Sequence, residues 1–254
     1  MTRVAVTGAT GRMGQEVITL ARDRDDVDLA FAVSRDPEDV ATDVTLESDG
    51  DLSALLAEHQ PDVLVDFTVP EASVEYVRAC AEAGVAVVVG TTGFADEQNA
   101  ALDAASETIP LLESSNFARG IQALLNVVEE AVAALPDYDI ELVETHHNGK
   151  RDAPSGTANM LLDRIDEQRS LERVYGREGD APRAADEVGV LVRRAGNIRG
   201  EHEVLLAGND EVVTLTHRAE SRGVFAAGAL DAAVWVATRD AGRYDFANVI
   251  DDSQ

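Results

Sequence analysis

Hydrophobic positions in the first 117 residues alternate between short apolar runs and segments with helical spacing. The runs predict strands over residues 3–7, 28–34, 62–69, 86–90 and 109–113. The helically spaced segments predict helices over residues 11–22, 52–58, 71–83 and 96–106. Alternating strands and helices are typical of a parallel sheet with helices on both faces, so the pattern predicts a Rossmann-type α/β domain.

The pattern changes after residue 117. It predicts a long helix over residues 121–135, a strand over 139–144 and a helix from 155 to about 169. Residues 170–188 are polar and weakly patterned, which predicts a loop. Strands are then expected over 190–194, 201–206 and 212–217, the last two forming a hairpin, before a closing helix over 224–238. We therefore expect residues 1–117 and 222–254 to form the Rossmann domain, and residues 118–221 to form an α+β domain with an open mixed sheet.

The charge composition limits the classes of partner. The formal net charge is −27 and the acidic residues are spread along the chain. Nucleic acids and anionic membranes need clustered basic side chains, so neither is expected as a partner. The charge favours a strongly solvated surface, as in a saline cytoplasm, over a cationic partner. Cys80 is the only cysteine, and neither a signal peptide nor an apolar run of membrane-spanning length is apparent, so we expect a cytoplasmic protein.

Lysine is almost absent from the sequence. Of 21 basic residues only Lys150 is a lysine, and the others are arginines. Chance is one explanation. The other is that this position needs a compact ammonium group able to release a proton, which a guanidinium group does not do.

A glycine-rich turn follows the first predicted strand and opens the first helix. Its sequence is Gly8-Ala9-Thr10-Gly11-Arg12-Met13-Gly14, with the spacing G-x-x-G-x-x-G. Glycines in this position allow a backbone to approach a pyrophosphate, which binds the N–H groups at the helix start. We interpret the turn as a dinucleotide site; the alternative is an ordinary glycine turn.

The second predicted strand ends at Ser34-Arg35. A carboxylate here would bind the ribose 2′-hydroxyl of NAD, whereas an arginine would accommodate the 2′-phosphate of NADP. Ser34 is not acidic, so the sequence favours NADPH, with NADH as the second cofactor. The alternative is that Arg35 is an ordinary solvated residue.

Two later strand ends are further candidates for cofactor contact, because ligands of open α/β sheets bind at the carboxyl ends of strands. The first is Gly90-Thr91-Thr92, and the second is Ser114-Ser115-Asn116-Phe117, where Asn116 could bond a carboxamide and Phe117 could flank a ring. Each segment alone is equally compatible with a plain loop.

The segment from His146 to Thr157 gathers protonatable groups in an otherwise acidic chain. Histidine and lysine are common proton donors near neutral pH. Ser155 is a predicted N-cap, and the N–H groups of Gly156 and Thr157 at the helix start form a site for a carboxylate. The alternative is a polar loop before a capped helix. A metal site is not favoured, because His146 and His147 have no third ligand at suitable spacing.

Several segments together resemble the 4-hydroxy-tetrahydrodipicolinate reductase family. They run in order over nearly the whole chain and include Gly8 to Gly14, Asp66 to Thr68, Gly90 to Gly93, Glu144 to Thr157 and Arg194 to Gly196. The resemblance implies a homotetramer in which the second domain binds substrate and oligomerises through its open sheet. It also implies NAD(P)H-dependent reduction in the diaminopimelate route to lysine, with hydride transfer to C4 of the substrate and loss of water.

The resemblance also implies roles for individual residues. His146 is the proton donor or acceptor, and Lys150 is a proton donor that also helps to hold substrate. His147, Gly156 and Thr157 bind a substrate carboxylate. The implied cofactor contacts are Gly8, Ala9, Thr10, Gly11, Arg12, Met13, Gly90, Thr91, Thr92, Ser114, Ser115, Asn116 and Phe117. The family often has an acid followed by arginine after the second strand, but here Ser34 replaces the acid and Arg35 remains.

Two rival functions stay open at this point. One is a different two-domain dehydrogenase acting on aspartate or homoserine, which the spacing of His146, His147 and Lys150 disfavours. The other is a cofactor-binding redox sensor without turnover. An assay of substrate-dependent NADPH oxidation separates both rivals from the reductase.

Overall fold

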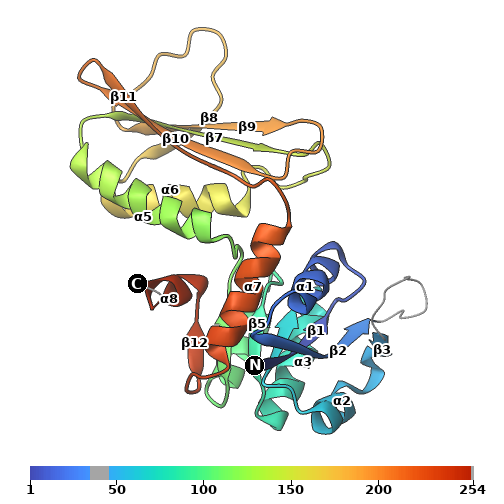
Figure 1. Cartoon of the computed structure of the whole chain (residues 1–254). Coiled ribbons are helices and arrows are strands. Elements are labelled where there is room, and N and C mark those ends of the chain that lie inside the picture. Colours follow the sequence, from blue (N-terminus) through green and yellow to red (C-terminus); the bar gives the residue numbers. More distant parts are fainter. Residues whose placement is uncertain (35–45, 253–254) are drawn as a thin grey trace. The chain divides into compact units, whose positions relative to one another are not determined.

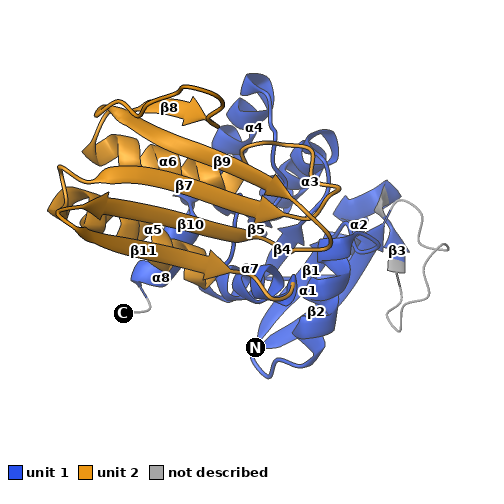
Figure 2. Cartoon of the chain, turned by 90° about the horizontal axis from the view of Figure 1, so that it is seen from above, with its two compact units in different colours: residues 1–118, 222–254 blue, residues 119–221 orange. Residues whose placement is uncertain are grey.

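The structure is a computed structural model that describes residues 1–34 and 46–252, so Arg35 lies outside the described residues. The chain divides into two compact units, coloured separately in Figure 2. Unit 1 comprises residues 1–118 and 222–254, and unit 2 comprises residues 119–221. Unit 1 is therefore built from two separate stretches of the sequence.

A seven-stranded parallel sheet forms the centre of unit 1. Its order is β12-β6-β5-β4-β1-β2-β3, and every neighbouring pair runs parallel. The bounds are β1 (Thr2–Thr7), β2 (Val27–Ser34), β3 (Leu46–Ser48), β4 (Val63–Asp66), β5 (Ala86–Val89), β6 (Pro110–Glu113) and β12 (Gly242–Tyr244). The predicted Rossmann-type sheet is confirmed.

Helices cover both faces of this sheet, which explains why its strands are almost continuously apolar. On β1, Val4 and Val6 pack in the core with α1, α7 and α8, whereas Ala5 packs in the opposite core with α2, α3 and α4. The bounds are α1 (Arg12–Arg22), η2 (Asp49–Asp51), α2 (Leu52–His59), α3 (Pro70–Ala83), α4 (Asp96–Ser106), α7 (Gly223–Val236) and α8 (Phe246–Asp251).

Unit 2 contains a five-stranded mixed sheet of order β11-β10-β7-β9-β8. Its strands are β7 (Asp139–His146), β8 (Glu172–Tyr175), β9 (Glu187–Arg194), β10 (Glu201–Gly208) and β11 (Glu211–Arg218). Helices α5 (Arg119–Ala134) and α6 (Gly156–Gln168) lie side by side on one face (Figures 1 and 2). Within unit 2, no described helix covers the other face. Leu191 and Val212 are exposed there, since their register partners Val143 and Ala207 alternate with the buried positions of β7 and β10. The predicted open mixed sheet is confirmed.

The structure corrects three sequence expectations. The segment 170–188 is not entirely loop, because β8 (Glu172–Tyr175) pairs with β9 at the edge of the sheet. The strand expected over residues 62–69 is only β4 (Val63–Asp66). Strand β3, and strand β12 and helix α8 after α7, are elements that the sequence does not predict. All of these elements are short, so they carry too few positions to establish a period.

Among the described residues, no helix combines the length and the apolar character needed to cross a bilayer.

Candidate active site

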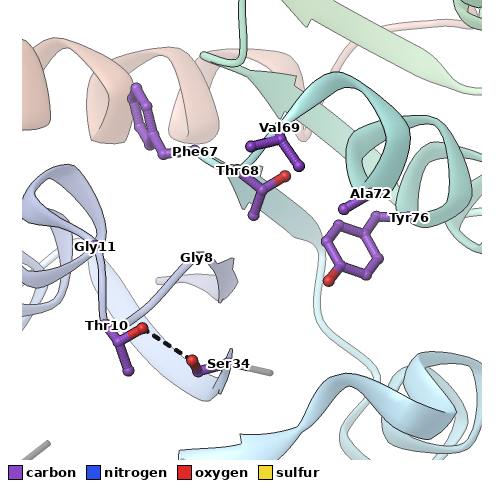
Figure 3. A pocket seen from close by; sticks show the side chains of 9 residues that line it. All are labelled: Gly8, Thr10, Gly11, Ser34, Phe67, Thr68, Val69, Ala72 and Tyr76. Carbon is purple, nitrogen blue, oxygen red and sulfur yellow. Dashed lines mark hydrogen bonds between the residues drawn. The ribbon is translucent and has the colours of Figure 1, made fainter. Parts of the chain in front are cut away.

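A pocket in unit 1 opens at the carboxyl ends of β1, β2 and β4 (Figure 3). These strands are neighbours in the sheet, so the turns that follow them lie close together. The residues that line the pocket are Gly8, Thr10, Gly11, Ser34, Phe67, Thr68, Val69, Ala72 and Tyr76. Three of the predicted cofactor residues therefore contribute directly to one concave surface.

The glycines of the first turn are required by close backbone packing. Gly8 has a φ of +71°, and a Cβ atom there would collide with the carbonyl group of Phe67. A Cβ atom at Gly14 would collide with the backbone of Gly8 and Ala9. The turn is closed by a 2.9 Å hydrogen bond from Gly11 N to Gly8 O. Side chains at these positions would fill the cradle or push the helix away from the turn.

The N-terminus of α1 is arranged to accept an anion. Its N-cap is Gly11, which has no side chain to bond the first-turn N–H groups, and the described first turn contains no acidic residue. Backbone N–H groups at a helix start attract negative charge, and a phosphate is the usual ligand in this context. Arg12 and Met13 lie in this turn, whereas the Ala9 side chain is buried in the core.

The edge of the pocket near Ser34 is uncharged in the described residues. Ser34 is the last residue of β2, and its hydroxyl group lies 2.9 Å from that of Thr10 (Figure 3). Apolar contact is provided by Val69, Ala72 and the ring of Tyr76. Tyr76 was not a predicted site residue. It lies on α3, and only the packing of this helix against the sheet brings its ring to the pocket, so no local sequence motif indicates its position.

Asp66 ties three strand ends together. Its buried carboxylate accepts hydrogen bonds from the hydroxyl groups of Thr7 (2.7 Å), Thr68 (2.6 Å) and Thr91 (2.6 Å). The Thr91 hydroxyl also accepts a 2.9 Å bond from Thr68 N. The hydroxyl group of Thr91 is thus bonded within the protein, and the predicted cofactor contact falls mainly to its backbone.

The remaining predicted cofactor residues lie at the ends of β5 and β6. A Cβ atom at Gly90 would strike the ring of Phe67, so the absence of a side chain permits this packing. Ser114 bonds the backbone of Asn116, whose side-chain oxygen accepts from Ala118 N at 2.8 Å. Phe117 is 2% exposed and packs edge-on against Phe67 and Phe246. Its ring is therefore part of the core. Thr92 and Ser115 lie in the neighbouring exposed loop segments.

In unit 2 the helix-covered side of the sheet turns from apolar to polar at the end of β7. Ile140 and Leu142 are buried apolar residues, and the next positions on the same face are Glu144 and His146. His202 on β10 is the register partner of Glu144, and Arg194 on β9 is that of His146. Three strands thus bring ionisable side chains together at one end of the sheet.

Glu144 is the centre of this cluster and is fully buried. Its carboxylate accepts from Nδ1 of His146 at 2.5 Å, from Ser155 N at 3.0 Å and from both Nη atoms of Arg194 at 2.7 and 2.8 Å. Burial alone would raise the pKa of Glu144, but the hydrogen bonds and charges of His146 and Arg194 outweigh it and lower the pKa to about 2. The carboxyl group is therefore ionised and acts only as an acceptor.

His202 lies against His146 and remains neutral. The two rings are 5.1 Å apart in an edge-on arrangement, and Nε2 of His202 lies 3.1 Å from the hydroxyl group of Ser155. Burial, followed by the charge of His146, lowers the pKa of His202 to about 3. A neutral imidazole here adds no charge, and Arg194, which bonds both carboxylate oxygens, balances the charge of Glu144.

The loop after β7 carries the other predicted substrate residues. It turns back through a hydrogen bond from Lys150 N to the carbonyl group of His147, and the Lys150 ammonium group lies 2.9 Å from the Asp152 carboxylate. Ser155 caps α6 by accepting from Ala158 N at 3.2 Å. Gly156 and Thr157 begin that helix, which has no acidic residue in its described first turn. The described residues contain no group of three or more potential metal ligands.

Comparison with known proteins identifies relatives along the whole chain. Residues 2–117 match the family described as "Dihydrodipicolinate reductase, N-terminus", and residues 120–250 match "Dihydrodipicolinate reductase, C-terminus". The 4-hydroxy-tetrahydrodipicolinate reductase of Haloarcula marismortui is 57% identical over 99% of this chain and 100% of its own length. The enzyme of the same name from Natronomonas pharaonis is 58% identical over 97% of this chain and 99% of its own length.

Solved structures agree with this assignment. Dihydrodipicolinate reductase from Paenisporosarcina sp. TG-14, bound to dipicolinate, has a TM-score of 0.80 and 26% identity, with 96% of this chain and 97% of that chain covered. An amine dehydrogenase from Mycobacterium smegmatis, at a TM-score of 0.60 and 16% identity over 95% and 94% of the two chains, shares the fold. The family matches over both units and the high identity to full-length relatives show that the chain belongs to the dihydrodipicolinate reductase family.

Proposed function

We propose that the protein is an NAD(P)H-dependent 4-hydroxy-tetrahydrodipicolinate reductase of lysine biosynthesis. The observation that carries the proposal is the site in unit 2, which places His146, the only lysine of the chain and the start of α6 within one strand–loop–helix segment. A small dicarboxylate needs local positive potential to approach a chain of net charge −27. The relatives named as this reductase support the substrate assignment.

The cradle in unit 1 fits a dinucleotide. Its glycines leave room for a pyrophosphate, the α1 N-terminus supplies N–H groups, and Tyr76 with Val69 and Ala72 supplies an apolar wall for a base. The reduced cofactor, when bound, supplies a hydride to C4 of the substrate as water is lost.

The residues of unit 2 then handle charge and protons. The N–H groups of Gly156 and Thr157, with His147, bind a substrate carboxylate. Hydride addition to a conjugated imine builds negative charge on the ring, and a nearby imidazolium or ammonium group neutralises it. We assign this proton transfer to His146 and Lys150.

A direct assay tests this function. Purified protein should oxidise NADPH, followed by absorbance, only when freshly prepared 4-hydroxy-tetrahydrodipicolinate is present. Aspartate and homoserine derivatives should give no signal, which separates this reductase from other two-domain dehydrogenases. Binding of NADPH without any substrate-dependent oxidation would instead support a redox sensor.

Replacing Lys150 by alanine should lower kcat by about 10²-fold, because the site loses both a proton donor and a cation for the substrate. The Kd for NADPH should change much less, since the cofactor contacts are proposed for unit 1. Steady-state kinetics and cofactor titration measure the two quantities. Arg164→Ala on α6 is the matched control, because it removes a half-exposed cation of the same unit outside the site. Wild-type turnover in Lys150→Ala would remove this residue from the mechanism.

We also propose that NADPH is preferred and that NADH is accepted. Ser34 presents a hydroxyl group where a carboxylate would repel a 2′-phosphate. Ser34→Asp should therefore lower the ratio of kcat/KM for NADPH to kcat/KM for NADH by about tenfold or more. Ser34→Ala is the control, since it removes the hydroxyl group without adding charge. A strong preference of the wild type for NADH would contradict the assignment, including the predicted role of Arg35.

The open face of the unit 2 sheet fits self-association, and we propose a homotetramer. Its exposed Leu191 and Val212 are large apolar side chains that a second copy could cover. Sedimentation equilibrium should give the mass of four chains, and Leu191→Arg should reduce that mass.

A further inference from the structure

The proposed mechanism leaves Glu144 without a role, although its carboxylate is bonded by His146 on the same strand, by Arg194 on β9 and by the start of α6. Glu144 is 0% exposed and holds four hydrogen-bond donors from three segments of the chain. Removing a carboxylate from water is costly, and such a buried group need not add stability to the fold. Its position therefore calls for a functional explanation.

The contacts of Glu144 divide between its two oxygens. Oε2 faces Nδ1 of His146 at 2.5 Å, and Oε1 accepts the backbone N–H of Ser155, the N-cap of α6. Arg194 bonds one Nη atom to each oxygen and also donates to the carbonyl group of Asp152. One carboxylate is thus linked at the same time to the proposed proton donor and to the helix end proposed to bind substrate.

We propose that Glu144 is a positioning residue for the reduction, which holds the hydrogen of His146 on Nδ1 so that Nε2 exchanges the proton with the substrate. This inference rests on the proposed function of His146. An ionised carboxylate accepts hydrogen bonds only, so the shared hydrogen belongs to the imidazole. The bond fixes the ring orientation and the position of the ring hydrogen, as a buried carboxylate does for histidine in other catalytic sites.

The surroundings of the imidazole agree with these two roles, in which Nδ1 bonds Glu144 and Nε2 exchanges the proton. Nε2 faces Gly200, where a Cβ atom would lie only 3.1 Å from it. A side chain at that position would crowd the nitrogen that exchanges protons. His146 contacts Glu144 on β7 and His202 on β10, and Arg194 on β9 bonds the same carboxylate as His146. Arg194 offsets the charge of Glu144, so the cluster does not repel an anionic substrate.

The test is a double-mutant cycle between Glu144→Gln and His146→Gln. Each single variant should lower kcat, Glu144→Gln by about 10²-fold, with a smaller change in the KM for substrate. Because Glu144 acts through His146, the double variant should be no slower than His146→Gln alone. Losses that multiply in the double variant would overturn the proposal. A wild type without turnover would instead overturn the proposed function.

A spectroscopic measurement tests the contact without activity. In protein labelled with nitrogen-15 histidine, the Nδ1 proton of His146 should resonate far downfield, as expected for a short bond to a carboxylate. The signal should disappear in Glu144→Gln and persist in Glu129→Gln, which removes a half-exposed glutamate that pairs with Arg164. Persistence of the signal in Glu144→Gln would overturn the proposal.

Glu144→Asp covers the case in which the glutamine variant does not fold. It keeps the charge for Arg194 but retracts the carboxylate by one methylene group from His146. We expect a lowered kcat and the same absence of an added loss in combination with His146→Gln. Full wild-type kcat in Glu144→Asp would show that the 2.5 Å contact has no role.

Discussion

Replacing His146 by glutamine should lower kcat by about 10²- to 10⁴-fold, the usual range for loss of a general acid or base. Glutamine keeps polar atoms near Glu144 but cannot become a cation or release a proton near neutral pH. His146 is 9% exposed, so bulk water has little access to replace it as a proton source. Single-turnover oxidation of NADPH isolates the chemical step from product release and is the appropriate measurement.

His59→Gln provides the control for this substitution. His59 lies at the end of α2 in unit 1, where its ring packs against Phe31 at 5.2 Å. Replacing His59 should leave the single-turnover rate close to that of the wild type. If His146→Gln turned over as fast as His59→Gln, Lys150 or solvent would have to supply the proton. A preserved Kd for NADPH in His146→Gln would show that the loss lies in chemistry and not in cofactor binding.

The second large effect is an acid sensitivity of folding caused by His202. Its pKa is about 3 in the folded chain against 6.5 for the ordinary imidazole, because burial disfavours the charged form. As the pH falls below 6.5 the unfolded chain binds a proton that the folded chain does not, so the unfolded state gains stability. The free energy of unfolding should fall by about 1.4 kcal/mol per pH unit until the pH approaches 3.

Urea unfolding at pH 7, 6, 5 and 4 measures this slope, and His202→Gln should reduce it. His217, whose pKa is also lowered by burial, contributes in the same direction and remains in this variant. Glutamine occupies similar space and can bond the Ser155 hydroxyl group, but it does not titrate.

Glu144 affects stability in a different pH range. Its lowered pKa stabilises the fold above pH 4.5, and that contribution is lost as the pH falls from 4.5 towards 2. A slope between pH 6.5 and 4.5 that was unchanged in His202→Gln would contradict the assignment.

The fold of unit 1 was predictable because its strands are buried on both faces. In Val63–Asp66 and Ala86–Val89, side chains that point to either face of the sheet are buried, so both segments are almost continuously apolar. The edge elements were not predictable for the opposite reason. Strand β8 contains Glu172 and Arg173, and its four residues are only partly buried or exposed. A sheet edge in contact with solvent leaves little hydrophobic signal in the sequence.

The candidate site was predictable where its residues are neighbours in sequence. The glycine turn and the segment from His146 to Thr157 are local, so their spacing alone indicates their chemistry. The network around Glu144 was not predictable, since Arg194 and His202 reach it from two other strands through register. The sequence also does not reveal which side chains are occupied by contacts within the protein and therefore unavailable to a ligand. Thr91 and Phe117 stand at strand ends, yet one bonds Asp66 and the other lies in the core.

The discontinuity of unit 1 has a consequence for how the chain matures. Helix α7 buries small side chains in the core that contains Val4 and Val65, and a Cβ atom at Gly228 would collide with the carbonyl group of Phe117. During synthesis this apolar face of the sheet is made long before the helix that covers it. Unit 2 is continuous and can complete itself in the interval. Until α7 is made, only α1 covers this face of the sheet, so part of its hydrophobic surface stays exposed. Exposed apolar surface favours aggregation, and we expect this to be the most aggregation-prone stage of synthesis.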